Sequence, residues 1–352
     1  MASAACALVA LAAPVAASGS SHTAAGSWTA TVSMSVARAN VTATRLGNGR
    51  VLVVGGSGET STELYDPAAR TWIPGGTLNE PRGLHVAVRL ADGRVLVAGG
   101  GFYTASAELY DPATNRWTPT GSMNVDRITF TGTLLRDGRV LVVGGLSANG
   151  TGVQASAELY TPATGRWTLT GSLRTPRRNH TATLLPDGKV LVAGGSNSNG
   201  WLSSAELYDP ARGRWVRTSP MTTSREHASA TLLGNGRVLV AGGGNPSAMR
   251  SAELYDPASG KWSVTGSMNN YGGRGALLQD GRVLVVGSDP GDVYSPATGT
   301  WTATGPMVYP YASAAAALLP NGQVLYVGGT KVKYCGQYSC DEPLADAELY
   351  TP

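Results

Sequence analysis

One unit of sequence returns seven times along this chain and limits its fold more than any other feature. Each copy has a glycine pair, then an acidic residue, an aliphatic residue, tyrosine, a variable residue and proline, and usually a tryptophan after them. The pairs begin at Gly55, Gly99, Gly144, Gly194, Gly242, Gly287 and Gly328, and the sixth is degraded to Gly-Ser. The period of about 45 residues is the length of one supersecondary unit, so we expect a repeat architecture with one such unit per copy.

The last copy ends at Pro352 without its tryptophan, whereas an extra tryptophan stands near the start of the chain. The segment around Trp28, Gly-Ser-Trp-Thr-Ala-Thr, closely matches the segment around Trp301, Gly-Thr-Trp-Thr-Ala-Thr. We therefore expect the N-terminal strand to supply the outer strand of the last unit. Such pairing would close a ring and leave no open strand edge between the first unit and the last.

The order of these landmarks resembles the kelch repeat, over almost the whole chain after the first residues. The resemblance implies an all-β fold, a seven-bladed β-propeller of four-stranded antiparallel blades, with the ring closed by the N-terminal strand around Trp28. We expect a secretory signal peptide over residues 1–20 and a single propeller over residues 21–352. Residues that return in every blade are interpreted as scaffold, and the tryptophans as packing wedges between blades.

The fourth copy shows how four strands fit into one unit. Residues 180–185 are predicted to form the innermost strand, and Pro-Asp-Gly at 186–188 a tight turn in which glycine supplies a positive φ. The Val/Leu run at 189–193 is typical of a strand buried on both faces. Residues 204–208 are predicted to form the third strand, and the fourth strand is expected around Trp215.

The first residues predict export. An apolar run at residues 4–13 is followed by small residues at 15–17, which suits cleavage after Ala17, and the run is too short to span a membrane. No Lys or Arg precedes Arg38, so the positive region that usually opens a signal peptide is missing. Either the true start lies upstream or the signal is atypical. A secreted or extracytoplasmic location is expected.

Composition and charge narrow the range of partners. Charged residues make up 14% of the chain, and the formal net charge is only +4. The basic residues are spread about one per repeat, with no Lys/Arg run and no interleaved aromatic stripe, so a nucleic-acid partner is not expected. A membrane span is not expected either, and we expect the propeller to be monomeric.

The cysteines agree with an exported protein. Cys6 would leave with the signal peptide, and Cys335 and Cys340 lie close together in an insertion over residues 330–346. An even pair at short spacing in such a loop is interpreted as a disulfide that pins the loop. A metal site would need two further ligands, which the neighbouring sequence does not offer, so neither a metal nor another cofactor is expected.

Strand direction predicts which face of the propeller binds a partner. If strands A to D of each blade are antiparallel, the B-to-C and D-to-A connections share one face and the A-to-B and C-to-D turns share the other. The A-to-B turns are short and repetitive, whereas the B-to-C loops vary in length and content, from 288–291 to 330–347. Variable loops on a rigid repeating scaffold usually hold the binding residues, so we expect this loop-rich face to bind the partner.

Five D-to-A connections place an arginine at the same position of the repeat. These residues are Arg38, Arg82, Arg127, Arg177 and Arg225, and the matching positions in the sixth and seventh copies are Asn270 and Tyr311. One interpretation is that the arginines hold adjacent blades together through backbone carbonyls. The other is a partial basic ring that faces an anionic or carbohydrate partner.

Residues that break the repeat on this face add further candidates. Exposed aromatic side chains in loops would suit sugar stacking or a protein hot spot. The full set of binding-face candidates is Arg38, Arg82, Arg127, Arg177, Arg178, Arg225, His180, His227, Phe102, Tyr103, Trp201, Tyr271, Tyr309 and Tyr311. His85, Glu226 and Arg274 also break the repeat here.

Catalysis is the alternative, because some seven-bladed kelch propellers are copper-radical oxidases of the galactose oxidase type. That chemistry needs two tyrosines, two histidines and a cysteine crosslinked to a tyrosine. This chain has four histidines, and His85 and His180 occupy matching positions in blades that are not adjacent, which disfavours a shared metal. Sugar mutarotases of this fold would need an acid and a base, and Glu226 beside His227 is the only such pairing in the channel-facing segments.

No catalytic residue is therefore assigned. The sequence predicts a secreted, non-catalytic kelch-repeat binding module that engages an extracellular protein or glycan through its loop-rich face. Two alternatives stay open at this point: a carbohydrate-active or copper-radical oxidase-like enzyme of the galactose oxidase type, and a structural surface component.

Overall fold

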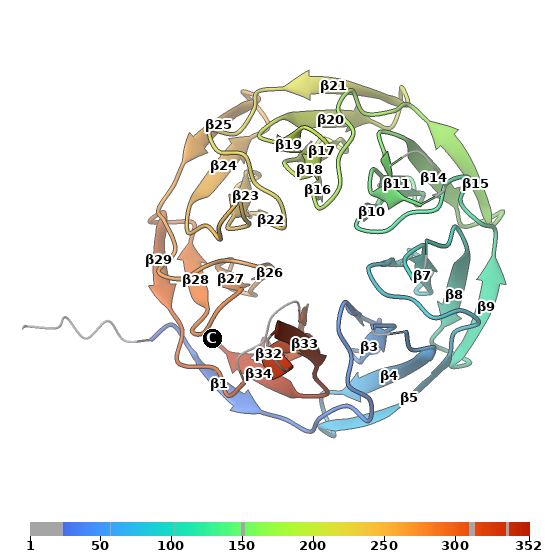
Figure 1. Cartoon of the computed structure of the whole chain (residues 1–352), viewed down its shortest axis with the longest axis vertical. Helices are drawn as coiled ribbons and strands as arrows, with labels where there is room; N and C mark the ends of the chain where they lie inside the picture. The colour runs from blue at the N-terminus through green and yellow to red at the C-terminus, as the bar shows by residue number, and fades with distance from the viewer. Residues whose placement is uncertain (1–23, 57, 102, 149–151, 310–313, 336–337) are drawn as a thin grey trace, which may run out of the picture.

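The protein is a ring of seven four-stranded antiparallel sheets around a central channel (Figure 1). The computed structural model describes residues 24–56, 58–101, 103–148, 152–309, 314–335 and 338–352, with the backbone alone at 332–335 and 338–340. In each blade the strands follow one another outward from the channel in the order A, B, C and D. Among the described residues there is no helix, and so none that is long and apolar enough to cross a membrane.

The strand bounds repeat closely from blade to blade. Blades 1 to 3 consist of β2 (Thr42–Arg45), β3 (Val51–Val54), β4 (Ser61–Asp66) and β5 (Thr71–Thr77); β6 (Val86–Arg89), β7 (Val95–Ala98), β8 (Ala107–Asp111) and β9 (Arg116–Thr120); and β10 (Thr131–Leu134), β11 (Val140–Val143), β14 (Ala157–Thr161) and β15 (Arg166–Thr170). Blades 4 and 5 consist of β16 (Thr181–Leu184), β17 (Val190–Ala193), β20 (Ala205–Asp209) and β21 (Arg214–Thr218); and β22 (Ser229–Leu232), β23 (Val238–Ala241), β24 (Ala252–Asp256) and β25 (Lys261–Val264). Blades 6 and 7 consist of β26 (Arg274–Leu277), β27 (Val283–Val286), β28 (Asp292–Ser295) and β29 (Thr300–Ala303); and β30 (Ala315–Leu318), β31 (Val324–Val327), β34 (Ala347–Thr351) and β1 (Ser27–Ala30).

Blade 7 is completed by the N-terminal strand, as the sequence predicted. Strand β1 pairs with β34 in the register Ser27↔Thr351 to Ala30↔Glu348 (Figure 1). The indole of Trp28 packs against the ring of Tyr350 with the centroids 5.1 Å apart, and its Nε1 donates to Thr304 Oγ1 at 3.0 Å. The predicted closure of the ring is therefore confirmed.

The hydrophobic core lies between blades. One cluster joins Val86 and Leu96 of blade 2 to Val140 and Trp167 of blade 3, and the strand-B runs are buried on both faces. In every blade the strand-C tyrosine and the strand-D tryptophan are register partners, with ring centroids 4.9–5.1 Å apart. The indole Nε1 of Trp167 donates to Gly121 O of the preceding blade at 2.7 Å. The tryptophans thus pack and hydrogen-bond across blade boundaries, which supports their interpretation as wedges.

Three of the B-to-C loops form additional two-stranded hairpins. These are β12 (Leu146–Ser147) with β13 (Gly152–Val153), β18 (Ser196–Asn197) with β19 (Gly200–Trp201), and β32 (Thr330–Cys335) with β33 (Tyr338–Pro343). Figure 1 shows β18 and β19 beside blade 4, and β32 and β33 over the inner part of blade 7. The extra structure is therefore added on the loop-rich face, while the opposite face keeps short turns.

Candidate functional site

The five matching arginines lie inside the blades. Arg127 represents them: its Nη1 donates to Gly144 O at 2.8 Å and to Ser156 O at 2.9 Å, and its Nη2 donates to Ser156 Oγ at 2.8 Å and to Glu158 Oε1 at 3.1 Å. The same pattern returns at the other four positions. We call these residues the inner arginines: Arg38, Arg82, Arg127, Arg177 and Arg225. Each is at most 1% exposed.

The backbone at the inner arginines links neighbouring blades. In the five pairs that precede a connection with an inner arginine, the second glycine donates its N–H to the arginine carbonyl, as from Gly145 to Arg177 O at 2.9 Å. Gly145 has φ 96°, and a Cβ there would approach Ile128 O to 2.7 Å, so the pair needs glycine for both conformation and space. The inner arginines therefore match the scaffold interpretation. Their guanidinium groups are covered by these contacts.

His180 is also buried between blades. Its Nε2 lies 2.9 Å from Thr131 Oγ1 of blade 3, and His85 makes the equivalent contact with Thr42 of blade 1. Burial, followed by the charge of Arg177, lowers the pKa of His180 to about 3, so the ring is neutral at ordinary pH. Both histidines are 7% exposed.

A chain of left-handed residues lines the channel where it opens on the loop-rich face, which we call the channel mouth. Two residues after each inner arginine, the backbone has φ between 52° and 58°. In blades 2 to 5 the N–H of this residue donates to the carbonyl of its equivalent in the preceding blade, at 3.0–3.3 Å. The five positions are Asn40, Leu84, Thr129, Asn179 and His227. Non-glycine residues with positive φ are strained, so the ring holds them in place through these contacts.

Glu226 gathers polar groups from blades 4 and 5 at this mouth. Its Oε2 accepts from Ser196 Oγ at 2.6 Å and from Asn179 Nδ2 at 3.0 Å, and its Oε1 accepts from Trp201 Nε1 at 3.1 Å. Burial raises the pKa of Glu226, but these three hydrogen bonds outweigh burial and hold the pKa below its usual range. Glu226 is therefore a carboxylate that fixes the hairpin β18–β19 to the next blade.

Trp201 is the exposed aromatic residue of this group. It is 42% exposed although its indole N–H is bound to Glu226. His227 follows Glu226 in sequence, and burial lowers its pKa, opposed by Glu226 and reinforced by Arg274 and Arg178. We call Asn179, Ser196, Trp201, Glu226 and His227 the mouth cluster. It presents an aromatic ring, a carboxylate and an amide from three separate segments of chain.

Blade 6 contributes Tyr271, which is 47% exposed. The guanidinium of Arg250 lies 5.2 Å from the centre of its ring, a cation–π distance. Here the inner arginine is replaced by Asn270, whose N–H donates to the shorter carboxylate of Asp292 at 2.8 Å. Tyr271 and the break in the scaffold pattern thus fall next to each other in the same connection.

Among the remaining candidates, Arg178 contacts the mouth cluster through its backbone. Arg178 is half-buried and its backbone bridges to Ser196, while Tyr103 and Tyr309 are half-buried. Phe102 and Tyr311 lie outside the described residues, and so do the side chains of Cys335 and Cys340. The disulfide therefore stays a prediction.

Blade 7 has a buried glutamate at the position of Glu158, but no arginine of the described residues pairs with it. Glu348 occupies the position of Glu158 and is 0% exposed. Its Oε2 accepts from Val308 N at 2.9 Å, and its Oε1 has no hydrogen-bond partner in the described part of the chain. Burial is the main cause that raises the pKa of Glu348 to about 7. This carboxyl is therefore largely protonated in mildly acidic solution.

Replacing Glu348 with glutamine should change how stability depends on pH. Because the folded pKa exceeds the unfolded value, the proton-linked contribution is full below about pH 4.5 and is lost as the pH rises through about 7. Glutamine does not titrate, so E348Q lacks this pH-dependent loss. Its free energy of unfolding, relative to that of the original chain, should therefore rise by about 2 kcal/mol between about pH 5 and about pH 8. Thermal or urea unfolding at both pH values measures this. E158Q is the matched control and should destabilise the protein at both pH values, since it removes the charge partner of Arg127. If the difference in unfolding free energy between E348Q and the original chain were the same at both pH values, the raised pKa of Glu348 would be wrong.

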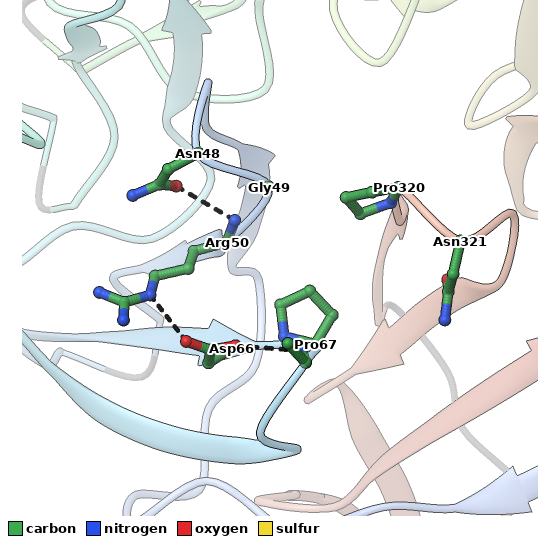
Figure 2. Close-up of a pocket in the computed structure, with 8 residues that line it drawn as sticks. Asn48, Gly49, Arg50, Asp66, Pro67, Pro320 and Asn321 are labelled. Carbon is green, nitrogen blue, oxygen red and sulfur yellow. Dashed lines mark hydrogen bonds and ion pairs between the residues drawn. The ribbon is translucent and has the colours of Figure 1, made fainter.

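The opposite face has a groove of about 580 Å³ between blades 7 and 1 (Figure 2). It is lined by Asn48, Gly49, Arg50, Asp66, Pro67, Ala68, Pro320 and Asn321. Arg50 Nε donates to Asp66 Oδ2 at 3.0 Å, whereas the equivalent Arg94 pairs with Asp92 in its own turn. The difference arises because Asn48 replaces the turn aspartate. The charges in this groove neutralise each other, and none of the binding-face candidates lies in it.

Comparison with known proteins agrees with the architecture. The family model described as Kelch motif matches residues 82–124, 177–222 and 227–269. No curated protein matches the chain. Among solved structures, a fungal alcohol oxidase described as having catalytic diversity among the AA5 family, in complex with copper, is similar with a TM-score of 0.76 and 21% identity. The match covers 93% of this chain and 76% of that one, and at this identity it shows the fold alone.

The described residues do not fit a copper site. His85 and His180 are buried in blades 2 and 4 and are each bonded to a threonine, and His22 lies outside the described residues. Across the described ranges, no group of three or more His, Cys, Asp or Glu side chains is placed to hold a metal ion. We therefore derive no reaction step through copper.

Proposed function

We propose that this seven-bladed propeller with kelch motifs is a non-catalytic binding module that engages an extracellular glycan or protein through its loop-rich face. A glycan is the partner that the mouth cluster suits best. The proposal includes export with removal of the residues before the propeller. An exported protein that keeps residues 1–20, detected by its intact mass, would contradict that part.

The observation that carries the proposal is the arrangement of Trp201. An exposed indole is usually free to change rotamer, but this one is tied through Nε1 to Glu226 on the neighbouring blade. The ring therefore offers its face with little entropy left to lose on binding. The carboxylate and the Asn179 amide beside it can hydrogen-bond hydroxyl groups of a ligand stacked on the ring.

The scaffold supports this role. The hairpin β18–β19 and the connection that holds Glu226 belong to different blades, which the inner arginines and the chain of left-handed residues keep in register. A site built from two such elements stays preorganised without a ligand. No proton transfer is needed for this function, and Glu226 is already engaged by three donors.

The W201A variant should lose binding without losing stability. Removing the exposed ring should weaken glycan binding at least about tenfold, since a pinned aromatic anchor commonly accounts for such a share of affinity. A glycan array followed by titration calorimetry measures this, with melting temperature as the check on folding. L169A, which removes a side chain that is 62% exposed on the outer strand β15, is the control and should bind normally. Unchanged binding by W201A, or stoichiometric copper with peroxide release from a sugar or alcohol, would contradict the proposal.

A further inference from the structure

A second pocket lies inside the central channel itself, with a volume of about 310 Å³. Its walls come from the inner parts of blades 1, 2, 6 and 7, so it exists only because the ring is closed. The lining residues are Asn40, Val41, Thr42, Ala43, Thr44, Leu84, His85, Ala87, Arg274, Gly275, Ala315 and Ala316. The volume is at the lower end of the range for small-molecule sites.

Arg274 breaks the repeat in this pocket. In each blade the first residue of strand A pairs with the last residue of strand B, which identifies the equivalent positions without ambiguity. The other six are short side chains: Thr42, Val86, Thr131, Thr181, Ser229 and Ala315. Only at Arg274, therefore, does this layer of the channel present a cation.

The guanidinium of Arg274 has no hydrogen-bond or ion-pair partner in the described part of the chain, and the residue is exposed. The inner arginines differ, because each is saturated by carbonyls, a serine and a glutamate. The positive charge of Arg274 nevertheless acts to lower the pKa of His227 at the mouth and of Tyr326 in blade 7. Arg274 is thus positioned over the channel with its donors uncommitted.

The other walls of the pocket carry no countercharge. No Asp or Glu of the described ranges lines it, and burial lowers the pKa of His85 to about 3, so that ring is neutral. The hydroxyl groups of Thr42 and Thr44 and the amide of Asn40 are the polar groups that accompany Arg274. A single cation among hydroxyls and an amide favours a ligand with one carboxylate and several hydroxyl groups.

We propose that this channel pocket binds the carboxylate of an acidic sugar, with Arg274 as the bidentate anchor and the threonine and asparagine side chains facing the ring hydroxyls. The proposal rests on the proposed glycan-binding function and deepens it, because the mouth cluster then contacts neighbouring sugar units while the uronate unit enters the channel. Arginine suits this role, since its planar fork matches carboxylate geometry in a way that lysine does not.

The test is titration calorimetry of the purified protein with D-glucuronate and with D-glucose as its neutral counterpart. We expect glucuronate to bind and glucose to bind at least about tenfold more weakly. R274Q should weaken glucuronate binding by at least about tenfold, because it removes a charge-assisted bidentate contact. R282Q is the matched control: it removes the same charge from the same blade in the A-to-B turn, where Arg282 pairs with Asp280, and it should bind normally.

Three results would overturn the assignment. They are equal affinity for glucuronate and glucose, unchanged glucuronate binding by R274Q, and no glucuronate binding at concentrations that saturate weak sugar sites. N-acetylglutamate, a dicarboxylate without ring hydroxyls, should bind at least about tenfold more weakly than glucuronate; equal affinity would point to an acidic peptide instead.

Failure of this inference can be separated from failure of the proposed function. If glycan binding depends on Trp201 but not on Arg274, the channel site is wrong and the binding module stands. If glucuronate binding depends on Arg274 while W201A binds glycans normally, the channel site stands and the role of the mouth cluster is wrong. Melting temperatures of both variants, each altered at an exposed side chain, should stay close to that of the original chain.

Discussion

A chain that begins at Met34 should fail to form a stable ring. It would lack β1, so β34 would become an open edge and Trp28, which is 7% exposed, would be lost from the core of blade 7. Loss of a buried tryptophan alone costs about 3–5 kcal/mol, a large share of the stability of a typical domain. The segment also joins blade 1, since Thr31 Oγ1 lies 2.9 Å from Tyr65 Oη. We expect the truncated protein to aggregate or to melt at a much lower temperature.

Two further chains make this experiment specific. A chain that begins at Ala24 keeps every described residue and should melt as the original does. W28A in the full chain keeps the strand but removes the indole contacts with Tyr350 and Thr304. Its melting temperature should therefore lie between those of the chains that begin at Ala24 and at Met34. A melting temperature unchanged by starting at Met34 would show that the N-terminal strand does not close the ring in solution.

Replacing Arg127 with alanine should destabilise the protein by about 3–5 kcal/mol, the usual cost of removing one partner of a buried ion pair. The change leaves Glu158 as a buried carboxylate without its cation, and it leaves the carbonyls of Gly144 and Ser156 without the guanidinium donors. R127K should recover little of the stability lost in R127A, because an ammonium group cannot supply the same planar set of donors. Urea unfolding of the purified variants measures these differences.

The control for this prediction is R139A. Arg139 pairs with Asp137 in an exposed turn, with its side chain 33% exposed, so its removal should cost no more than about 1 kcal/mol. Glycan binding provides a second readout, because a folded fraction of R127A should still bind at the mouth cluster. If R127A kept full stability and lost binding instead, the inner arginines would belong to the binding rim after all.

Most of the fold could be predicted from local patterns. The strands expected at 180–185, 189–193 and 204–208 and around Trp215 correspond to Thr181–Leu184, Val190–Ala193, Ala205–Asp209 and Arg214–Thr218. The sequence pattern is reliable because every blade is packed in the same way, with a Val/Leu run buried between neighbouring blades and a tyrosine–tryptophan pair at the outer edge. The match between the segments around Trp28 and Trp301 was enough to predict closure.

The candidate site could be predicted only in part. Trp201, Glu226 and His227 break the repeat and were therefore visible in the sequence, but the hydrogen bond between Trp201 and Glu226 crosses from one blade to the next. The chain of left-handed residues was missed because its five positions share no common side chain. A signal did exist, since each lies two residues after an inner arginine.

The sequence by itself determined the number of blades, the order of strands within them and the strand that closes the ring, because these depend on local periodicity and on repeated contacts between neighbours. Only the tertiary structure decided which polar residues are free to bind. An arginine in a connection can point outward or turn inward, and the carbonyls, serine and glutamate that draw the inner arginines inward come from strand ends 17 to 31 residues later. Arg274 has no such partners among the described residues, and that difference becomes visible only when the blades surround the channel.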